Sequence, residues 1–318
     1  MDGDLEFSPS EVTLSNIKEL NIRQSVLSEQ KICEMSELAD AAGDFVCGLL
    51  QSGMNTYEAL SVLSEGVKMD FEAVHSEALG ENIARLMRSG VKDCMFDRAV
   101  FCQMLLSKMK GGGFSFSEGD FLRSESREES FVYVKNTLSD EAYDVFSQSF
   151  ENPRVRYAES FKEAVKALTD GSASYCLLPI EEKGGARLPT VSELIFGNEL
   201  KIVALTPVFG PDGTADVKYA LLSRHFFVPD VSADDDRYLE VRFGKNTGTL
   251  LSEVLSAAEL FGIDLYRINT ESYDTEEGKK TFYSSVFKTE GEDFTQLLVY
   301  LTLYSVDYTP IGIYSNLE

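Results

Sequence analysis

Positive charge is scarce in this sequence. Its 318 residues include 29 Lys and Arg against 53 Asp and Glu, a formal net charge of −24. A field this negative repels nucleic-acid phosphates, and no Lys- or Arg-rich stretch offsets it locally. The longest charge-free apolar run, residues 294–306, is about two-thirds of the length that a bilayer-spanning helix needs. No basic region followed by an apolar run opens the chain. We therefore expect a cytoplasmic protein with neither a nucleic-acid nor a membrane partner.

Histidine and cysteine are also scarce. The two histidines lie far apart in the sequence, which argues against a His-rich metal site. The five cysteines are odd in number and none belongs to a Cys-x-x-Cys pair, which argues against a disulfide framework and a structural zinc site. We expect reduced, mostly buried thiols, no metal and no cofactor.

The first part of the chain has helical periodicity. Apolar residues recur at helical spacing through residues 1–110 without strand alternation, which predicts an all-helical domain of four to six helices. Asn55 followed by Glu58 predicts a capping box at the start of one of them. Residues 111–129 begin with three glycines and are rich in serine and charge, which is typical of a linker.

Two further segments alternate strands with helices, so we expect an α/β and α+β multidomain protein. Residues 130–229 follow the rhythm of a single open α/β sheet, with a helix whose N-cap we place at Ser139. Residues 237–318 have the order βαββαβ of a ferredoxin-like unit. Within that unit, residues 263–268 and 281–287 are predicted as strands.

Four short motifs in these two segments carry a family resemblance. They are residues 160–167 followed by Gly171, then 178–183, then Gly248-Thr249-Leu250, and finally 311–314. In this order they resemble prephenate dehydratase with its C-terminal ACT regulatory domain, over about residues 131–318. The resemblance implies a substrate loop formed by Ser139, Glu181, Glu182 and Lys183.

The catalytic part of that pattern is altered. Where the family has Thr-Arg-Phe, the best alignment places Val217-Lys218-Tyr219, and the connection over residues 205–217 is too short for the family's second lobe. Val217 cannot donate a proton, Lys218 replaces a bidentate guanidinium with a point charge, and Glu182 adds negative charge facing a dianionic substrate. This favours a non-catalytic, regulatory relative.

A different alignment of the catalytic tripeptide is compatible with an active enzyme. If Ser223-Arg224-His225 takes the place of the tripeptide, Thr137, Ser223 and Arg224 are the residues that would carry the chemistry. The chain would then be a divergent prephenate dehydratase that forms phenylpyruvate in phenylalanine biosynthesis.

The ACT-like part implies a ligand loop and a mode of assembly. A loop before the first helix would offer backbone N–H groups to an amino-acid carboxylate, unless it is only a tight turn. Because the second ligand motif lacks the family's Arg and Pro, we expect a small amino acid as ligand, with no strong preference for phenylalanine. We expect a homodimer through this sheet, which has an edge and one face to cover. The expected ligand-binding residues are Asn246, Thr247, Gly248, Thr249, Leu250, Asn269, Thr270 and Glu271.

A second enzymatic activity is an alternative for the helical segment. Arg23, Lys31, Arg85 and Arg88 are the cations available to a chorismate mutase, as in bifunctional family members, but their spacing fits poorly. We prefer an interaction or dimerisation domain.

Overall fold

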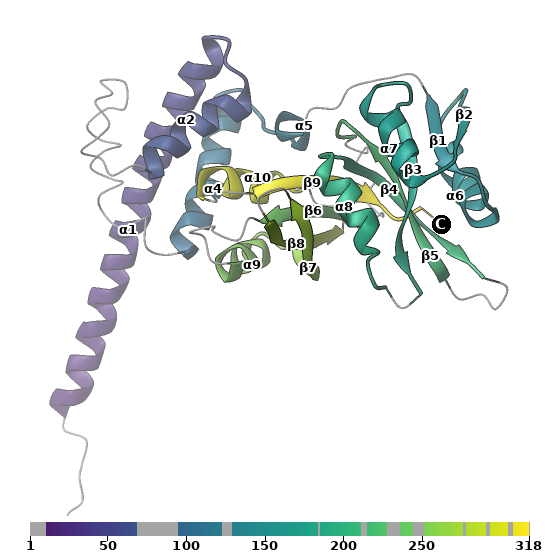
Figure 1. The fold of residues 1–318 in the computed structure, drawn as a ribbon. Coiled ribbons are helices and arrows are strands. Elements are labelled where there is room, and N and C mark those ends of the chain that lie inside the picture. Colours follow the sequence, from purple (N-terminus) through teal and green to yellow (C-terminus); the bar gives the residue numbers. More distant parts are fainter. Residues whose placement is uncertain are drawn as a thin grey trace, which may run out of the picture.

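Two β-sheets lie side by side, and the helices of the N-terminal part cover the far side of the second one (Figure 1). The architecture is therefore mixed α/β, as expected. The structure is a computed structural model. It describes residues 11–68, 95–122, 129–183, 185–210, 215–227, 236–243, 251–275, 278–290, 293–304 and 308–317.

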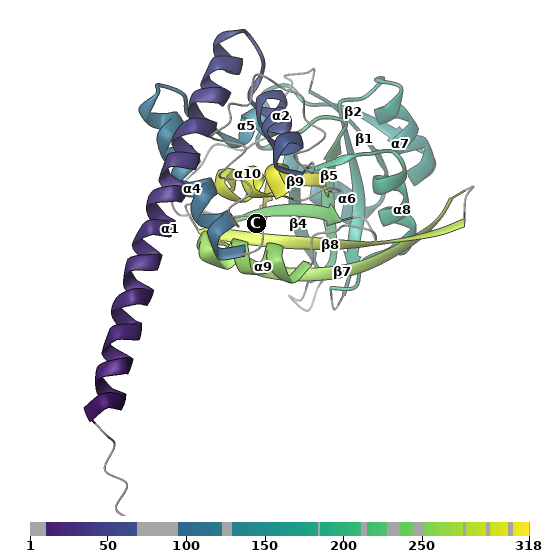
Figure 2. The same ribbon diagram turned by 90° about the vertical axis from the view of Figure 1, so that its left-hand side faces the viewer.

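The described elements of the N-terminal part are all helices, joined by short turns. Helix α1 is long and projects away from the body in both views (Figures 1 and 2). The capping box is confirmed, because Asn55 Oδ1 accepts a hydrogen bond from Glu58 N at 2.9 Å and the Glu58 carboxylate accepts one from Asn55 N at 3.4 Å. The helices are α1 (Glu11–Gln51), α2 (Thr56–Lys68), α4 (Met95–Gly111) and α5 (Glu118–Phe121).

The first sheet, here called the α/β sheet, has the strand order β2-β1-β3-β5-β4. Strand β1 pairs in parallel with β2 and β3, whereas β5 is antiparallel to both β3 and β4. Helix α6 packs on one face, and α7 and α8 pack on the other. The strands are β1 (Ser130–Val134), β2 (Arg154–Ala158), β3 (Tyr175–Glu182), β4 (Lys201–Phe209) and β5 (Ala215–Ser223); the helices are α6 (Thr137–Ser147), α7 (Phe161–Thr169) and α8 (Pro189–Gly197).

The start of α6 differs from the prediction. Its N-cap is Asn136, not Ser139, and the side chain of Asn136 accepts from Ser139 N at 2.9 Å. Ser139 is the third helical residue, and its hydroxyl accepts from Asn136 N at 2.9 Å, which completes a capping box. The prediction was wrong because both residues are good capping types, and only the extended backbone at Asn136 (φ −157°) identifies the cap.

The C-terminal sheet has the order β7-β8-β6-β9, with every described pair antiparallel. Its elements follow one another as βαββαβ, which is the predicted order. Strand β7 is longer than the predicted 263–268, because it continues to pair with β8 as far as Thr275, opposite Gly278. The elements are β6 (Asp236–Phe243), α9 (Leu251–Leu260), β7 (Asp264–Thr275), β8 (Gly278–Glu290), α10 (Thr295–Tyr304) and β9 (Tyr308–Ser315).

Helix α10 accounts for the long charge-free run. Leu297, Leu298 and Leu301 pack with the C-terminal sheet, whereas Tyr300 and Leu303 pack with the hydrophobic core of α1, α2 and α4. A helix that is buried on all sides has no face for charge. Among the described helices, none combines the length and the apolar composition that a membrane crossing requires.

The segment predicted as a linker contains an anchored turn. Glu118, the first residue of α5, is buried and forms an ion pair with buried Arg237 of β6. Leu122 is also buried, in the core between the C-terminal sheet and its helices. Glu118 and Leu122 are therefore packed into the fold, although the composition of the segment predicts a flexible linker.

The face of the C-terminal sheet opposite α9 and α10 packs on the α/β sheet. Tyr238, Val286 and Tyr314 share one hydrophobic core with Ile195 of α8 and Ile202 of β4. The same chain thus covers a face that we expected a second subunit to cover. Beyond β9, the two sheets also meet edge to edge, because Leu317 N donates to Leu205 O at 2.7 Å.

Gly312 of β9 lies at this junction, and replacing it tests the contact. A Cβ at this position would overlap the carbonyl oxygen of Ile202, which is backbone and cannot swing away. We expect Gly312→Ala to lower the free energy of unfolding by about 1–3 kcal/mol, the usual cost of overpacking. Urea denaturation followed by circular dichroism measures this loss. Gly197→Ala is the control, because a Cβ there meets no atom within 4 Å. Equal stabilities of the two variants would contradict the close approach.

Candidate functional site

The candidate site lies at the carboxyl end of β3, where ligands of open α/β sheets commonly bind. Glu181 and Glu182 end this strand and pair with Lys218 and Val217 of β5. The tripeptide 217–219 thus lies beside Glu181 and Glu182 in the sheet. Glu182 and Lys183 are exposed, whereas Glu181 is buried.

Glu181 is held by guanidinium groups of its own chain. Arg267 of β7 forms an ion pair with its carboxylate and also donates to the carbonyl oxygen of Gly185 at 3.3 Å. Arg187, in the connection from β3 to α8, places Nε 3.7 Å from the same carboxylate. The loop after β3 is therefore tied to the C-terminal sheet.

A second carboxylate, Glu240 of β6, extends this cluster into the interior. Glu240 is fully buried and accepts a 2.7 Å hydrogen bond from Arg187 Nη2. Ser284 Oγ donates to it at 2.5 Å and Tyr314 Oη at 3.2 Å. We call Glu181, Arg187, Lys218, Glu240 and Arg267 the interface cluster.

Burial and neighbouring charge shift the pKa values in this cluster. Burial alone would raise the pKa of Glu240, but Arg187 and the hydrogen bonds from Ser284 and Tyr314 together hold it below its usual value. Burial, helped by the charges of Arg267 and Arg187, lowers the pKa of Lys218 against the opposing attraction of Glu181. Burial and the Glu240 charge raise the pKa of Tyr314 well above its usual value.

The interface cluster balances most of its own charge. Its three cations face two carboxylates, which leaves one net positive charge where a dianionic substrate would need several cationic donors. Within this cluster Lys218 is the residue best suited to chemistry, because a half-buried lysine with a lowered pKa can act as an acid or base. Lys218 also pairs with Glu181 in the sheet, and this position suits a purely structural ion pair equally well.

The residues of the alternative register are not brought together. Ser223 pairs with Lys201 at the opposite end of β5 and lies five residues from Lys218, or roughly 17 Å along an extended strand. Its hydroxyl accepts from His225 N at 3.2 Å, and Arg224 Nη1 donates to Thr169 O at 3.0 Å. Thr137, by contrast, is exposed at the start of α6, which follows the carboxyl end of β1.

Ser139 has a local role that the prediction did not assign. Its hydroxyl is buried in the capping box of α6 and donates to Val134 O at 2.8 Å. It therefore shapes the turn after β1.

The residues expected to bind an amino acid are only partly described. Positions 246–250 lie outside the described residues. Asn269, Thr270 and Glu271 lie in the middle of β7, where they pair with residues 284, 283 and 282 of β8. The amide nitrogen of Asn269 is buried and has no hydrogen-bond partner among the residues that the structure describes, and Thr270 is exposed. Of the four cations considered for the helical segment, only Lys31 has a described side chain, and it is exposed on α1.

Sequence patterns missed Arg187, Glu240 and Arg267. They come from the connection between β3 and α8, from β6 and from β7, so no local motif links them. No local signal marked Glu240, because it alternates with Leu239 and Val241 and so takes the polar position of its strand. Its burial follows only from the packing of the second face of this sheet.

The four cysteines of the described residues are free, with Cys102 and Cys176 buried. Burial raises the pKa of both of these thiols, which makes them poor nucleophiles. Within the described part of the chain, no three His, Cys, Asp or Glu side chains are grouped as metal ligands would be.

Comparison with known proteins finds similarity at the level of structure. Neither a protein-family model nor a curated protein sequence matches the chain. Among similar solved structures is the prephenate dehydratase of Streptococcus mutans, 18% identical, with a TM-score of 0.48 over 59% of this chain and 99% of that one. Another is the prephenate dehydratase of Arthrobacter aurescens in complex with L-Phe, 13% identical, with a TM-score of 0.41 over 58% and 89%. A third, GqqA, described as a novel type of quorum quenching acylase, is 18% identical, with a TM-score of 0.43 over 59% and 96%.

Proposed function

We propose that this chain is a non-catalytic relative of the prephenate dehydratases and acts as a cytoplasmic regulatory or scaffold protein. In this proposal residues 1–110 form a helical domain, residues 130–229 a single dehydratase-like lobe, and residues 237–318 an ACT-like domain. The domain boundaries follow the sequence pattern.

The interface cluster carries the proposal. The resemblance places the family's proton donor and arginine at Val217 and Lys218, beside Glu181. Dehydration of prephenate needs a donor for the departing hydroxide and cations for two carboxylates. Val217 has no proton to give, and Arg187 and Arg267 already bind Glu181. Glu182 adds an exposed negative charge at the same strand end.

The short connection between β4 and β5 also supports the proposal that this chain lacks the family's second lobe. The two strands form one antiparallel pair from Lys201–Ser223 to Phe209–Ala215, so that residues 210–214 alone join them. Five residues cannot form a lobe that closes over a substrate.

We expect the purified full chain to form no phenylpyruvate from prephenate above the uncatalysed background. The assay follows phenylpyruvate absorbance at neutral pH, with an authentic prephenate dehydratase as positive control. Robust turnover that Thr137→Ala abolishes would overturn the proposal, because Thr137 is exposed at the start of α6, on the same edge of the sheet as Glu181. Lys162→Gln, an exposed change on α7, is the matched control.

Binding of a small amino acid and a homodimer through the C-terminal sheet belong to the same proposal. Strand β7 is the outer strand of that sheet and exposes Leu265, Tyr266 and Ile268, which supports an interface between copies at this edge. Light scattering at micromolar concentration distinguishes a dimer from a monomer.

A further inference from the structure

Lys218 lies beside the ion pairs of the interface cluster. It is the partner of Glu181 in the antiparallel pair of β3 and β5, so the two side chains leave the same face of the α/β sheet. On that face the Glu181 carboxylate meets Arg267 of β7. The amine of Lys218 is therefore placed on the side of the sheet that packs on the C-terminal sheet.

Guanidinium groups bind both carboxylates of the cluster. Arg267 and Arg187 lie on the carboxylate of Glu181, and Arg187 also donates to Glu240 at 2.7 Å. A structural lysine would occupy the Glu181 carboxylate itself. Within the described part of the chain, the amine of Lys218 forms neither an ion pair nor a hydrogen bond, and other side chains act on it only through their charge.

The charges of the cluster balance only when Lys218 is neutral. Its two guanidinium groups offset its two carboxylates, so a protonated amine adds one positive charge without a counterion. Arginine keeps its proton in proteins, which leaves Lys218 as the cation that can lose one. Burial and the charges of Arg267 and Arg187 lower the pKa of its amine, and the Glu181 charge opposes them. The neutral amine is therefore more abundant at neutral pH than that of an ordinary lysine.

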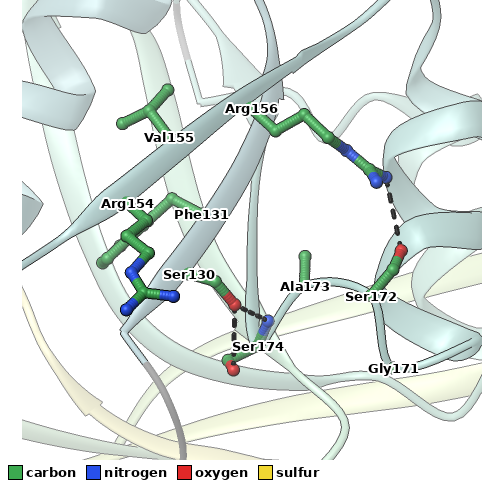
Figure 3. Close-up of a pocket in the computed structure, with 9 residues that line it drawn as sticks. All are labelled: Ser130, Phe131, Arg154, Val155, Arg156, Gly171, Ser172, Ala173 and Ser174. Carbon is green, nitrogen blue, oxygen red and sulfur yellow. Dashed lines mark hydrogen bonds between the residues drawn. The ribbon is translucent and has the colours of Figure 1, made fainter.

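Other buried or clustered polar groups of the two sheets are held by bonds within the chain. Burial also lowers the pKa of Lys201 on β4, but its amine donates to Pro310 O at 3.2 Å. The hollow at the amino ends of β1, β2 and β3 lies at the opposite edge of the α/β sheet, and there Arg156 Nη2 donates to Ser172 Oγ at 3.3 Å (Figure 3). Lys218 differs from both, because no such bond fixes its amine.

The surroundings of Lys218 select the kind of ligand. Its side chain is half-buried, so a small molecule can reach it from solvent. Glu182 and Lys183 are exposed at the adjoining end of β3, and these opposite charges favour neither an anion nor a cation. An uncharged electrophile therefore meets the least electrostatic opposition. A neutral lysine amine is the nucleophile that forms imines with carbonyl compounds.

We propose that Lys218 binds a small uncharged aldehyde as a reversible imine. The amine nitrogen attacks the carbonyl carbon to give a carbinolamine, which loses water as the C=N bond forms. Both N–H protons leave with the carbonyl oxygen in that water, so no oxidant or reductant takes part, and hydrolysis releases the aldehyde unchanged. A neutral imine also keeps the charges of the cluster balanced. The inference goes beyond the regulatory function proposed above, because it gives the α/β sheet a covalent ligand without turnover.

Reductive trapping on the full chain tests this assignment. Propanal and sodium cyanoborohydride near neutral pH convert each imine into a stable propylamine, and peptide mass spectrometry gives the initial rate at each lysine. We expect Lys218 to react about tenfold faster than Lys162, which is exposed on α7, and faster than Lys201. At about pH 10 its advantage over Lys162 should shrink, because alkaline solution deprotonates exposed lysines as well.

Arg267→Gln tests the role of the cluster. It removes a charge that lowers the pKa of Lys218 and releases Glu181 to pair with the amine, so trapping at Lys218 should slow about threefold or more. Arg156→Gln, an exposed change at the opposite edge of the sheet, should leave that rate unchanged. Circular dichroism checks that both variants are folded.

Two results would overturn the proposal. One is a rate at Lys218 in the unmodified chain that does not exceed the rates at Lys162 and Lys201. The other is a folded Arg267→Gln variant that is trapped at Lys218 as fast as the unmodified chain. Neither result depends on phenylpyruvate formation, so the failure of this inference and that of the proposed function are distinguishable.

Discussion

Replacement of Glu118 by glutamine is expected to lower the free energy of unfolding by about 3–5 kcal/mol, the usual cost of leaving a buried charge without its partner. Glu118 accepts hydrogen bonds from Arg237 Nη1 at 3.1 Å, from Arg237 Nη2 at 2.5 Å and from Phe294 N at 2.7 Å. A neutral amide cannot balance the guanidinium, and both side chains are shielded from water. The loss would be a large part of a typical total stability of about 5–15 kcal/mol.

Urea denaturation followed by far-ultraviolet circular dichroism measures this loss, because the chain contains no tryptophan for fluorescence. Glu141→Gln is the matched control, since Glu141 is exposed on α6 and its replacement should change stability by less than about 0.5 kcal/mol. The double variant Glu118→Leu/Arg237→Met should lose less than the sum of its single changes, because it leaves no unpaired charge. A Glu118→Gln loss as small as that of the control would refute the role assigned to this pair.

Glu240→Gln is expected to have an effect of similar size, about 3–5 kcal/mol, at the junction of the two sheets. The substitution keeps the volume, but it removes the 2.7 Å ion pair between Arg187 and Glu240. The new amide group also presents N–H donors to a site where Ser284 and Tyr314 already donate. Glu193→Gln, an exposed change on α8, should leave stability nearly unchanged.

The pH dependence gives a separate test of Glu240. Its pKa is lower in the folded protein than in the unfolded chain, so the folded state favours the ionised form. The stability that Glu240 contributes is therefore present above its unfolded pKa of about 4.3 and is lost as the pH falls through the lower folded value. The unmodified chain should lose this stability on acidification below about pH 4.3, whereas Glu240→Gln should lack that part of the slope. Parallel stability curves for the two proteins would contradict the assignment.

The sequence by itself determined the order and type of most elements. Helical spacing predicted helices before residue 111, and alternating segments predicted the βαββαβ order of residues 237–318, both of which the structure contains. The capping box between Asn55 and Glu58 was also predictable from the sequence, because these residues are three positions apart. These features depend on short-range hydrogen bonds and on which side of an element is apolar, and both are visible in a short stretch of sequence.

Only the tertiary structure decided which charged side chains are buried and which of them form ion pairs with one another. Glu118 and Arg237 are 119 positions apart, Arg187 and Glu240 are 53 apart, and Arg267 and Glu181 are 86 apart. Which of these side chains meet depends on strand order and on how the two sheets pack, and neither leaves a local pattern. The sequence did not predict the full length of β7 for the same reason. Its polar second half forms a strand only because it pairs with β8. The prediction failed wherever a residue's partner is distant in sequence, because the free energy of a buried charge is set by that partner and not by its neighbours along the chain.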